Sequence, residues 1–106
     1  MKWIGTFLAI TVMALAMLAP PISAQSQPLI VATGVADGTY ARFFSDISKT
    51  CPQPPLQGVA SQGSVENLER VMNNTANLAF VQADVLFAKK LVEHDPAVES
   101  IRAFLV

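Results

Sequence analysis

The chain has 106 residues, of which 52% are hydrophobic and 14% are charged, and its formal net charge is −1. A charge this weak, without a basic cluster, argues against nucleic-acid binding, because such proteins must neutralise many phosphates. Cys51 is the single cysteine. The chain therefore cannot build the internal disulfide framework that staples many small exported domains.

Residues 1–24 have the pattern of a cleavable secretory signal peptide. Lys2 gives a positive start, an uncharged apolar stretch runs from Ile4 to Leu18, and Ile22-Ser23-Ala24 ends in a small residue. An uncleaved membrane anchor is the alternative, but spanning a bilayer needs roughly 20 apolar residues. We expect an exported chain of residues 25–106, whose net charge falls from −1 to −2 when Lys2 is removed.

The first predicted strand and helix lie between residues 29 and 55. Leu29–Thr33 is a short apolar run rich in β-branched residues, which predicts a buried strand. A turn from Gly34 to Gly38 leads to Thr39, which we expect to be the N-cap of a helix. The proline cluster at 52–55 ends this helix. Its apolar face recurs at i, i+3, i+4 and i+7 and consists of Tyr40, Phe43, Phe44 and Ile47.

The second predicted strand is Leu56–Ala60, and Gly63 or Ser64 then opens a second helix. Asn73-Asn74 closes this helix. Its apolar residues are expected on one face and its charged residues in solvent. The apolar set is Val65, Leu68, Val71 and Met72, and the charged set is Glu66, Glu69 and Arg70.

A third strand is predicted at Leu78–Val81, followed by a helix from Val85 to about Leu91. Asp95-Pro96 predicts an N-cap and the first position of a fourth, short helical turn. A further apolar run begins at Ile101 and continues to Val106.

This βαβαβα order predicts an α/β fold with a mostly parallel sheet and helices on both faces. In such sheets, ligands bind outside the carboxyl ends of the strands. The segments that follow the three strands, residues 34–40, 61–67 and 82–84, are therefore expected to meet at one edge of the sheet.

These three segments supply ten candidate ligand-binding residues. A helix start offers free backbone N–H groups and a partial positive charge, which suit a carboxylate. Each candidate also has a structural alternative: a glycine turn, a helix cap, a turn hydroxyl or, for the tyrosine, a place in the core. The candidates are Gly34, Gly38, Thr39, Tyr40, Ser61, Gly63, Ser64, Asn67, Gln82 and Asp84.

Three motifs resemble the TAXI family, the solute-binding subunits of TRAP transporters. Thr33-Gly34 with Gly38-Thr39-Tyr40 is similar to that family's first loop, Gly63–Leu68 to its second-loop signature, and Leu78–Val85 to its third strand and loop. The resemblance implies a type II periplasmic-binding-protein lobe. It also implies a small carboxylate or amino-acid ligand, a TRAP-type membrane permease as partner, and a periplasmic location.

The same resemblance implies binding and hinge closure, without a cofactor or a chemical step. It favours Gln82 over Asp84 as a ligand contact. Val35, Asp37 and Asn77 depart from the family's pattern, which bears on the identity of the ligand more than on the fold.

Receptors of this family have two lobes, so residues 25–106 are expected to be part of the first lobe only. The apolar run to Val106, which has no cap or polar tail, favours the same interpretation. The alternative is a small exported interaction module, derived from a solute receptor, that binds no solute.

Enzyme functions find little support in the sequence. His94 is the only histidine and lies in a polar loop, and the stretch from Gly58 to Gly63 lacks the spacing of a G-x-S-x-G nucleophile elbow. No cluster has metal-ligand spacing. Three interpretations of Cys51 remain open: an unpaired loop thiol, a partner on another chain, or a partner in a missing continuation of the chain.

Overall fold

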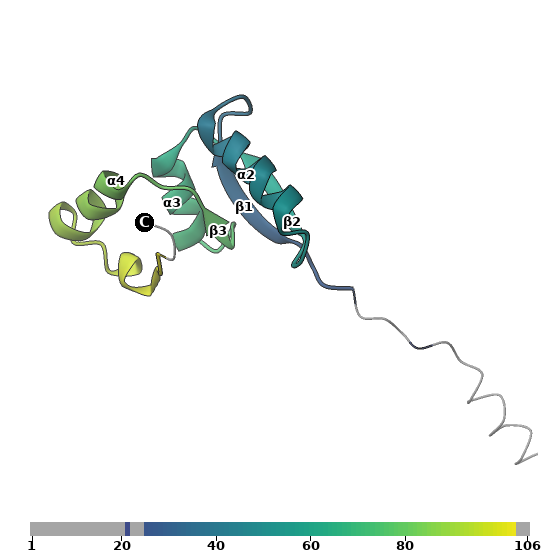
Figure 1. Ribbon diagram of the computed structural model, residues 1–106. Helices are drawn as coiled ribbons and strands as arrows, with labels where there is room; N and C mark the ends of the chain where they lie inside the picture. The colour runs from purple at the N-terminus through teal and green to yellow at the C-terminus, as the bar shows by residue number, and fades with distance from the viewer. Residues whose placement is uncertain (1–20, 22–24, 104–106) are drawn as a thin grey trace, which may run out of the picture.

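The computed structural model describes Pro21 and residues 25–103. It contains a sheet of three parallel strands, which confirms the predicted α/β class (Figure 1). The strands are β1 (Leu29–Gly34), β2 (Leu56–Ala60) and β3 (Leu78–Ala79), in the spatial order β2-β1-β3. The predicted signal peptide lies, apart from Pro21, outside the described residues, as does the end of the apolar run that begins at Ile101.

The register of the sheet is set on both edges of β1. Leu29 lies opposite Leu56, Val31 lies opposite Leu78, and the pairing with β2 shifts between Ala32 and Gly34. Just before β3, Asn77 continues the ladder with its own side chain. Its backbone N–H donates to the Ile30 carbonyl at 2.9 Å, and its Oδ1 accepts from the Ile30 N–H at 2.8 Å.

Helices cover both faces of the sheet. Helix α2 (Thr39–Thr50) packs on β1 and β2, whereas α3 (Ser64–Met72) packs on β1 and β3. Figure 1 shows α2 on one side of β1, with α3 and α4 on the other. This arrangement follows from the strand order, because the crossover from β1 to β2 and the crossover from β2 to β3 run in opposite directions across the sheet, and right-handed crossovers of opposite direction place their helices on opposite faces.

A C-terminal helical segment follows β3. It consists of α4 (Ala83–Phe87), the π-helix η1 (Ala88–Val92) and the 3-10 helix η2 (Pro96–Ser100). No residue of α4 or η1 is buried. Within residues 25–103, none of the helices combines the length and apolarity needed to cross a membrane.

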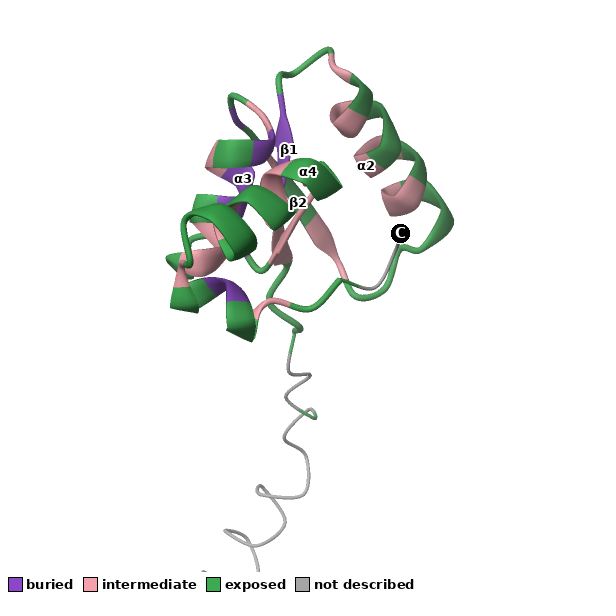
Figure 2. Cartoon of the chain, turned by 90° about the vertical axis from the view of Figure 1, so that its left-hand side faces the viewer, coloured by how far each residue is buried: buried purple, intermediate pink, exposed green. Residues whose placement is uncertain are grey.

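The buried apolar core is small and centres on β1 and α3 (Figure 2). Helix α2 contributes no fully buried residue. Its contact with the sheet includes the ring of Phe44, which lies against Gly58 of β2. A Cβ on Gly58 would lie 2.7 Å from a ring carbon of Phe44, so glycine lets this ring rest against β2. The buried apolar residues are Val31, Ala32, Leu68, Ala76 and Val98.

Several predicted boundaries hold. Helix α3 begins at Ser64 after Gly63, and it ends at a C-cap on Asn73. Asp95 caps η2 by accepting from the Ala97 N–H at 3.0 Å, with Pro96 at the first helical position.

Other details of the sequence prediction are wrong. The N-cap of α2 is Gly38 rather than Thr39, β3 ends at Ala79 rather than Val81, and the third helix begins at Ala83 rather than Val85. Val65 was expected on the apolar face of α3 but is 53% exposed, since the buried face runs through Ser64, Asn67 and Leu68. Those three residues have the helical spacing i, i+3, i+4.

Candidate functional site

The segments that follow the three strands meet at one hollow of about 510 Å³. We call it the strand-end hollow, because it lies at the carboxyl ends of β1 and β2. The end of β1 and the start of α2 line it, together with the start of α3 and the residue before α4. Its lining residues are Thr33, Gly34, Val35, Thr39, Tyr40, Gln62, Gly63, Ser64 and Gln82.

Two helix N-termini open onto this hollow. Thr39 and Tyr40 begin α2, and Ser64 begins α3. Among the described residues, no hydrogen-bond acceptor is found for the backbone N–H groups of Thr39, Tyr40 and Ser64. Unpaired N–H groups of this kind carry a partial positive charge and favour an anion.

None of the nine lining residues carries a charged side chain. The polar groups that the hollow offers are neutral: hydroxyls of Thr39, Tyr40 and Ser64, and the side-chain amides of Gln62 and Gln82. An anion in this hollow would be held by N–H and O–H donors rather than by an ion pair.

Two glycines shape the wall of the hollow through their backbone. Gly34 has φ +111° and Gly63 has φ +121°, a region that side-chain-bearing residues rarely adopt. A Cβ on Gly63 would meet no heavy atom within 4 Å, so this backbone faces open space. Gly38 has a different role, because a Cβ there would lie 2.7 Å from the Val35 side chain in the turn before α2.

The Ser64 hydroxyl connects three helix starts. Its Oγ accepts a hydrogen bond from the Gln82 N–H at 2.9 Å and lies 3.3 Å from the Tyr40 hydroxyl, where either group can donate. The Tyr40 ring stacks on Phe80 with a centroid separation of 5.4 Å. Ser64 therefore links the start of α2, the start of α3 and the residue before α4 in the wall of the hollow.

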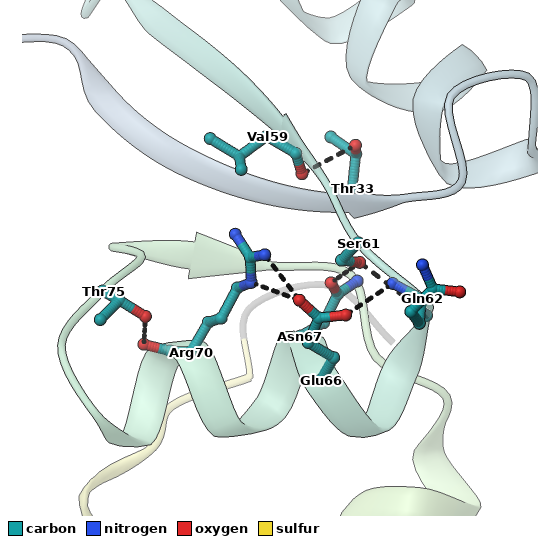
Figure 3. A network of polar contacts seen from close by, with 9 residues as sticks. Thr33, Val59, Ser61, Gln62, Glu66, Asn67, Arg70 and Thr75 are labelled. Atoms are coloured by element: carbon teal, nitrogen blue, oxygen red, sulfur yellow. Dashed lines mark hydrogen bonds and ion pairs between the residues drawn. The ribbon is translucent and has the colours of Figure 1, made fainter.

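Ser61 and Asn67 are buried and do not line the hollow, and Figure 3 shows their side chains pointing toward each other. The Ser61 hydroxyl donates to Asn67 Oδ1, and Asn67 Nδ2 donates to the Phe80 carbonyl at 2.8 Å. Asn67 is completely buried, with 0% exposure. The side chains of these two predicted ligand-binding residues are thus already satisfied by the protein, and Asn67 ties α3 to the residue after β3.

Glu66 and Arg70 make a second polar network on α3 (Figure 3). Glu66 Oε2 accepts from the Gln62 N–H at 2.8 Å, and its Oε1 accepts from Arg70 Nε at 2.9 Å and Nη2 at 2.6 Å. The hydrogen bond from Gln62, followed by that from Arg70, lowers the pKa of Glu66 below its ordinary 4.5. These residues were expected to be simply solvated, but they brace the loop that carries Gln62 and Gly63.

Six of the ten predicted residues line the hollow: Gly34, Thr39, Tyr40, Gly63, Ser64 and Gln82. The other four do not. Gly38 lies in the turn, Ser61 and Asn67 are buried, and Asp84 is exposed, where its Oδ1 accepts from the Val85 N–H at 2.9 Å.

Sequence reasoning missed three lining residues, Thr33, Val35 and Gln62. Thr33 and Gln62 each lie within or next to a motif that had been singled out, so their position at a strand end was a usable signal. Thr33 is 5% exposed and its hydroxyl donates to the Val59 carbonyl at 3.2 Å, so it holds β1 to β2.

Other reactive side chains lie apart from the hollow. His94 is exposed and has φ +53°, and Cys51 is exposed with a free thiol. In the part of the chain that the structure describes, no three His, Cys, Asp or Glu side chains gather in a way that could hold a metal ion.

Comparison with known proteins does not identify the chain: no protein-family model, curated protein or solved structure matches it.

Proposed function

We propose that this chain is an extracytoplasmic solute-binding protein, or a part of one, that captures a small carboxylate or an amino acid. The observation that carries the proposal is the meeting of all three strand-end segments at one hollow of about 510 Å³. Ligand sites in open α/β sheets are expected at this position. Binding without a chemical step is consistent with a lining that has hydrogen-bond donors and no charged side chain.

The proposed ligand contacts follow from the lining. The N–H groups at the starts of α2 and α3 would hold a carboxylate, assisted by the hydroxyls of Thr39 and Ser64. The amide of Gln82 would bind a second polar group of the solute. Asp84 lies outside the lining, so it is not part of the proposed site.

The motifs that resemble the TAXI family extend this proposal to delivery. In that proposal the protein works in the periplasm after removal of a signal peptide and passes its solute to a TRAP-type permease. Residues 25–106 would be part of the first of two lobes that close on the ligand, in a hinge motion typical of such receptors.

A charge placed in the hollow tests the proposal. Thr39 is exposed and begins α2, whose first turn contains no acidic residue, so Thr39→Glu suits the helix and puts a carboxylate beside the proposed ligand. We expect the wild-type protein to gain melting temperature with at least one member of a panel of amino acids and organic acids. Thr39→Glu should abolish that gain through like-charge repulsion.

Thr39→Gln is the matched control, because it has a similar size without the charge and should keep much of the ligand-induced shift. If no member of the panel raises the melting temperature of the wild-type protein, the solute-binding proposal is wrong. If both variants respond like the wild type, the ligand binds elsewhere.

Exposed apolar side chains favour a second candidate, a small interaction module without a solute. Phe87, Leu91 and Val92 are 58%, 63% and 76% exposed on α4 and η1. Apolar surface of this kind often marks a protein contact. A protein partner that is lost on Leu91→Gln and retained on Thr39→Glu would favour this candidate over solute binding.

A further inference from the structure

The C-terminal helical segment, residues 83–100, is attached weakly along its length. Val98 is its one buried residue, and α4 and η1 contain none. Segments with so little buried surface are drawn from the low-stability end of a protein and open locally without global unfolding. The hydrogen bonds at the N-terminal end of the segment therefore decide how often it detaches from α3.

The root of the segment is held by hydrogen bonds from α3. Ser64 Oγ accepts from the N–H of Gln82, the residue immediately before α4, and Asn67 Nδ2 donates to the Phe80 carbonyl. Only the first of these bonds lies in the wall of the strand-end hollow. Ser64 is 8% exposed whereas Gln82 is exposed, so this bond is partly shielded from competing water.

The same hydroxyl reaches across the hollow to α2. The Tyr40 hydroxyl lies 3.3 Å from Ser64 Oγ, and the two residues are 24 positions apart in the sequence. A change on the α2 wall can therefore act on the Gln82 N–H through one shared oxygen atom.

We propose that the Ser64 hydroxyl is a latch that couples the α2 wall of the strand-end hollow to the opening of residues 83–100. Tyr40 is a positioning residue in this device, because it orients the Ser64 hydroxyl without contacting the segment through that bond. The coupling concerns the hollow of the proposed function, but it is a property of the chain itself, and its test requires no ligand.

Amide hydrogen exchange on the full chain tests the latch. In Ser64→Ala, we expect amides 82–92 to exchange about fivefold faster, since the loss of one part-buried hydrogen bond shifts an opening equilibrium by roughly that factor. Ser64→Thr, which keeps a hydroxyl, should restore most of the protection. Ser48→Ala is the matched control, because the Ser48 hydroxyl donates to the Phe44 carbonyl within α2 and lies far from the segment in sequence.

Tyr40→Phe tests the coupling across the hollow, because it keeps the ring that stacks on Phe80 and removes only the hydroxyl. We expect a smaller acceleration over residues 82–92 than in Ser64→Ala, and none beyond Ser64→Ala in the double variant. Additive effects in the double variant would overturn the coupling. The latch is overturned if Ser64→Ala accelerates β1 as much as residues 82–92, or accelerates residues 82–92 no more than Ser48→Ala.

Discussion

At the scale of single residues, the buried side-chain amide of Asn67 stabilises the fold, although asparagine is usually a surface residue. Asn67 is fully buried, yet both ends of its side chain have partners, Ser61 at one end and the Phe80 carbonyl at the other. Buried polar groups are tolerated when they are satisfied in this way, and they are costly when one partner is removed. Asn67 therefore stabilises the junction of α3 with the end of β3.

Asn67→Ala should lower the free energy of unfolding by about 2–4 kcal/mol, because it leaves the Ser61 hydroxyl and the Phe80 carbonyl unpaired and opens a cavity. Urea denaturation monitored by circular dichroism measures the loss. Asn73→Ala, at the exposed C-cap of the same helix, should change stability by less than about 0.5 kcal/mol. Equal effects of the two substitutions would contradict the assigned role of Asn67.

At the scale of elements, the loop between β2 and α3 is shaped by the helix that follows it. Glu66, in the first turn of α3, reaches back to the Gln62 N–H while Arg70 holds its other oxygen. This resembles a capping box displaced by one residue, since the accepted N–H belongs to the residue before the N-cap. The bracing fixes the loop in which Gly63 adopts φ +121°.

The bracing by Glu66 predicts a pH dependence of stability. The pKa of Glu66 is lowered first by the hydrogen bond from Gln62 and then by that from Arg70. The folded chain therefore favours the deprotonated form of Glu66 more strongly than the unfolded chain does. This stabilisation is complete above pH 4.5 and is lost as the pH falls through the lowered pKa.

The measurement compares urea midpoints of the wild type and Glu66→Gln between pH 7 and pH 3. We expect the wild type to be the more stable above pH 4.5 and the difference to shrink below it. Glu69→Gln provides the control on the same helix, because no hydrogen bond to the Glu69 side chain is found among the described residues. A gap that stays constant across the range would show that the Glu66 charge makes no contribution.

At the scale of the whole molecule, the apolar residues range from a small buried core, through many half-buried side chains, to an open surface. Leu68 is 1% exposed on α3, which packs on β1 and β3, whereas Leu91 is 63% exposed on η1. The free energy of burying apolar surface is therefore concentrated in the contact of α3 with the sheet. The C-terminal helical segment adds little to it.

The same truncation at these two leucines should have very different effects. Leu68→Ala should lower the free energy of unfolding by about 2–5 kcal/mol through lost burial and a new cavity. Leu91→Ala should change it by less than about 0.5 kcal/mol. Chemical denaturation of both variants checks the contrast, and a loss of more than about 1 kcal/mol for Leu91→Ala would mean that this side chain is covered in solution.

The sequence predicted the class of fold and the place of the hollow, because both depend on periodic patterns. Apolar runs at β1 and β2, helical spacing in α2 and α3, and polar segments after each strand were enough. The sequence did not show which polar side chains turn inward. Asn67 shares the helical spacing i, i+3, i+4 with Ser64 and Leu68, so a signal existed, but residue type favoured a solvent or ligand contact.

Helix starts and short strands were harder to predict for a different reason. Gly38 and Thr39 are both acceptable N-caps, and only the backbone geometry, with Gly38 at ψ 175°, decides between them. The third strand stops at Ala79 although Phe80 and Val81 favour strands. Phe80, the residue after the strand, stacks its ring on that of Tyr40. The two residues are 40 positions apart in the sequence, so no local pattern predicts this contact.

The strand order has a consequence for how the chain can fold as it is synthesised. β1 lies at the centre of the sheet, yet it is made before the other two strands of that sheet. One edge of β1 stays unpaired until β2 is made, because Leu29 pairs with Leu56. The other edge stays unpaired until β3 is made, because Val31 pairs with Leu78. Closing loops of this length precedes any gain from pairing. A nascent chain that has reached only Ala60 must therefore keep one side of its central strand unpaired.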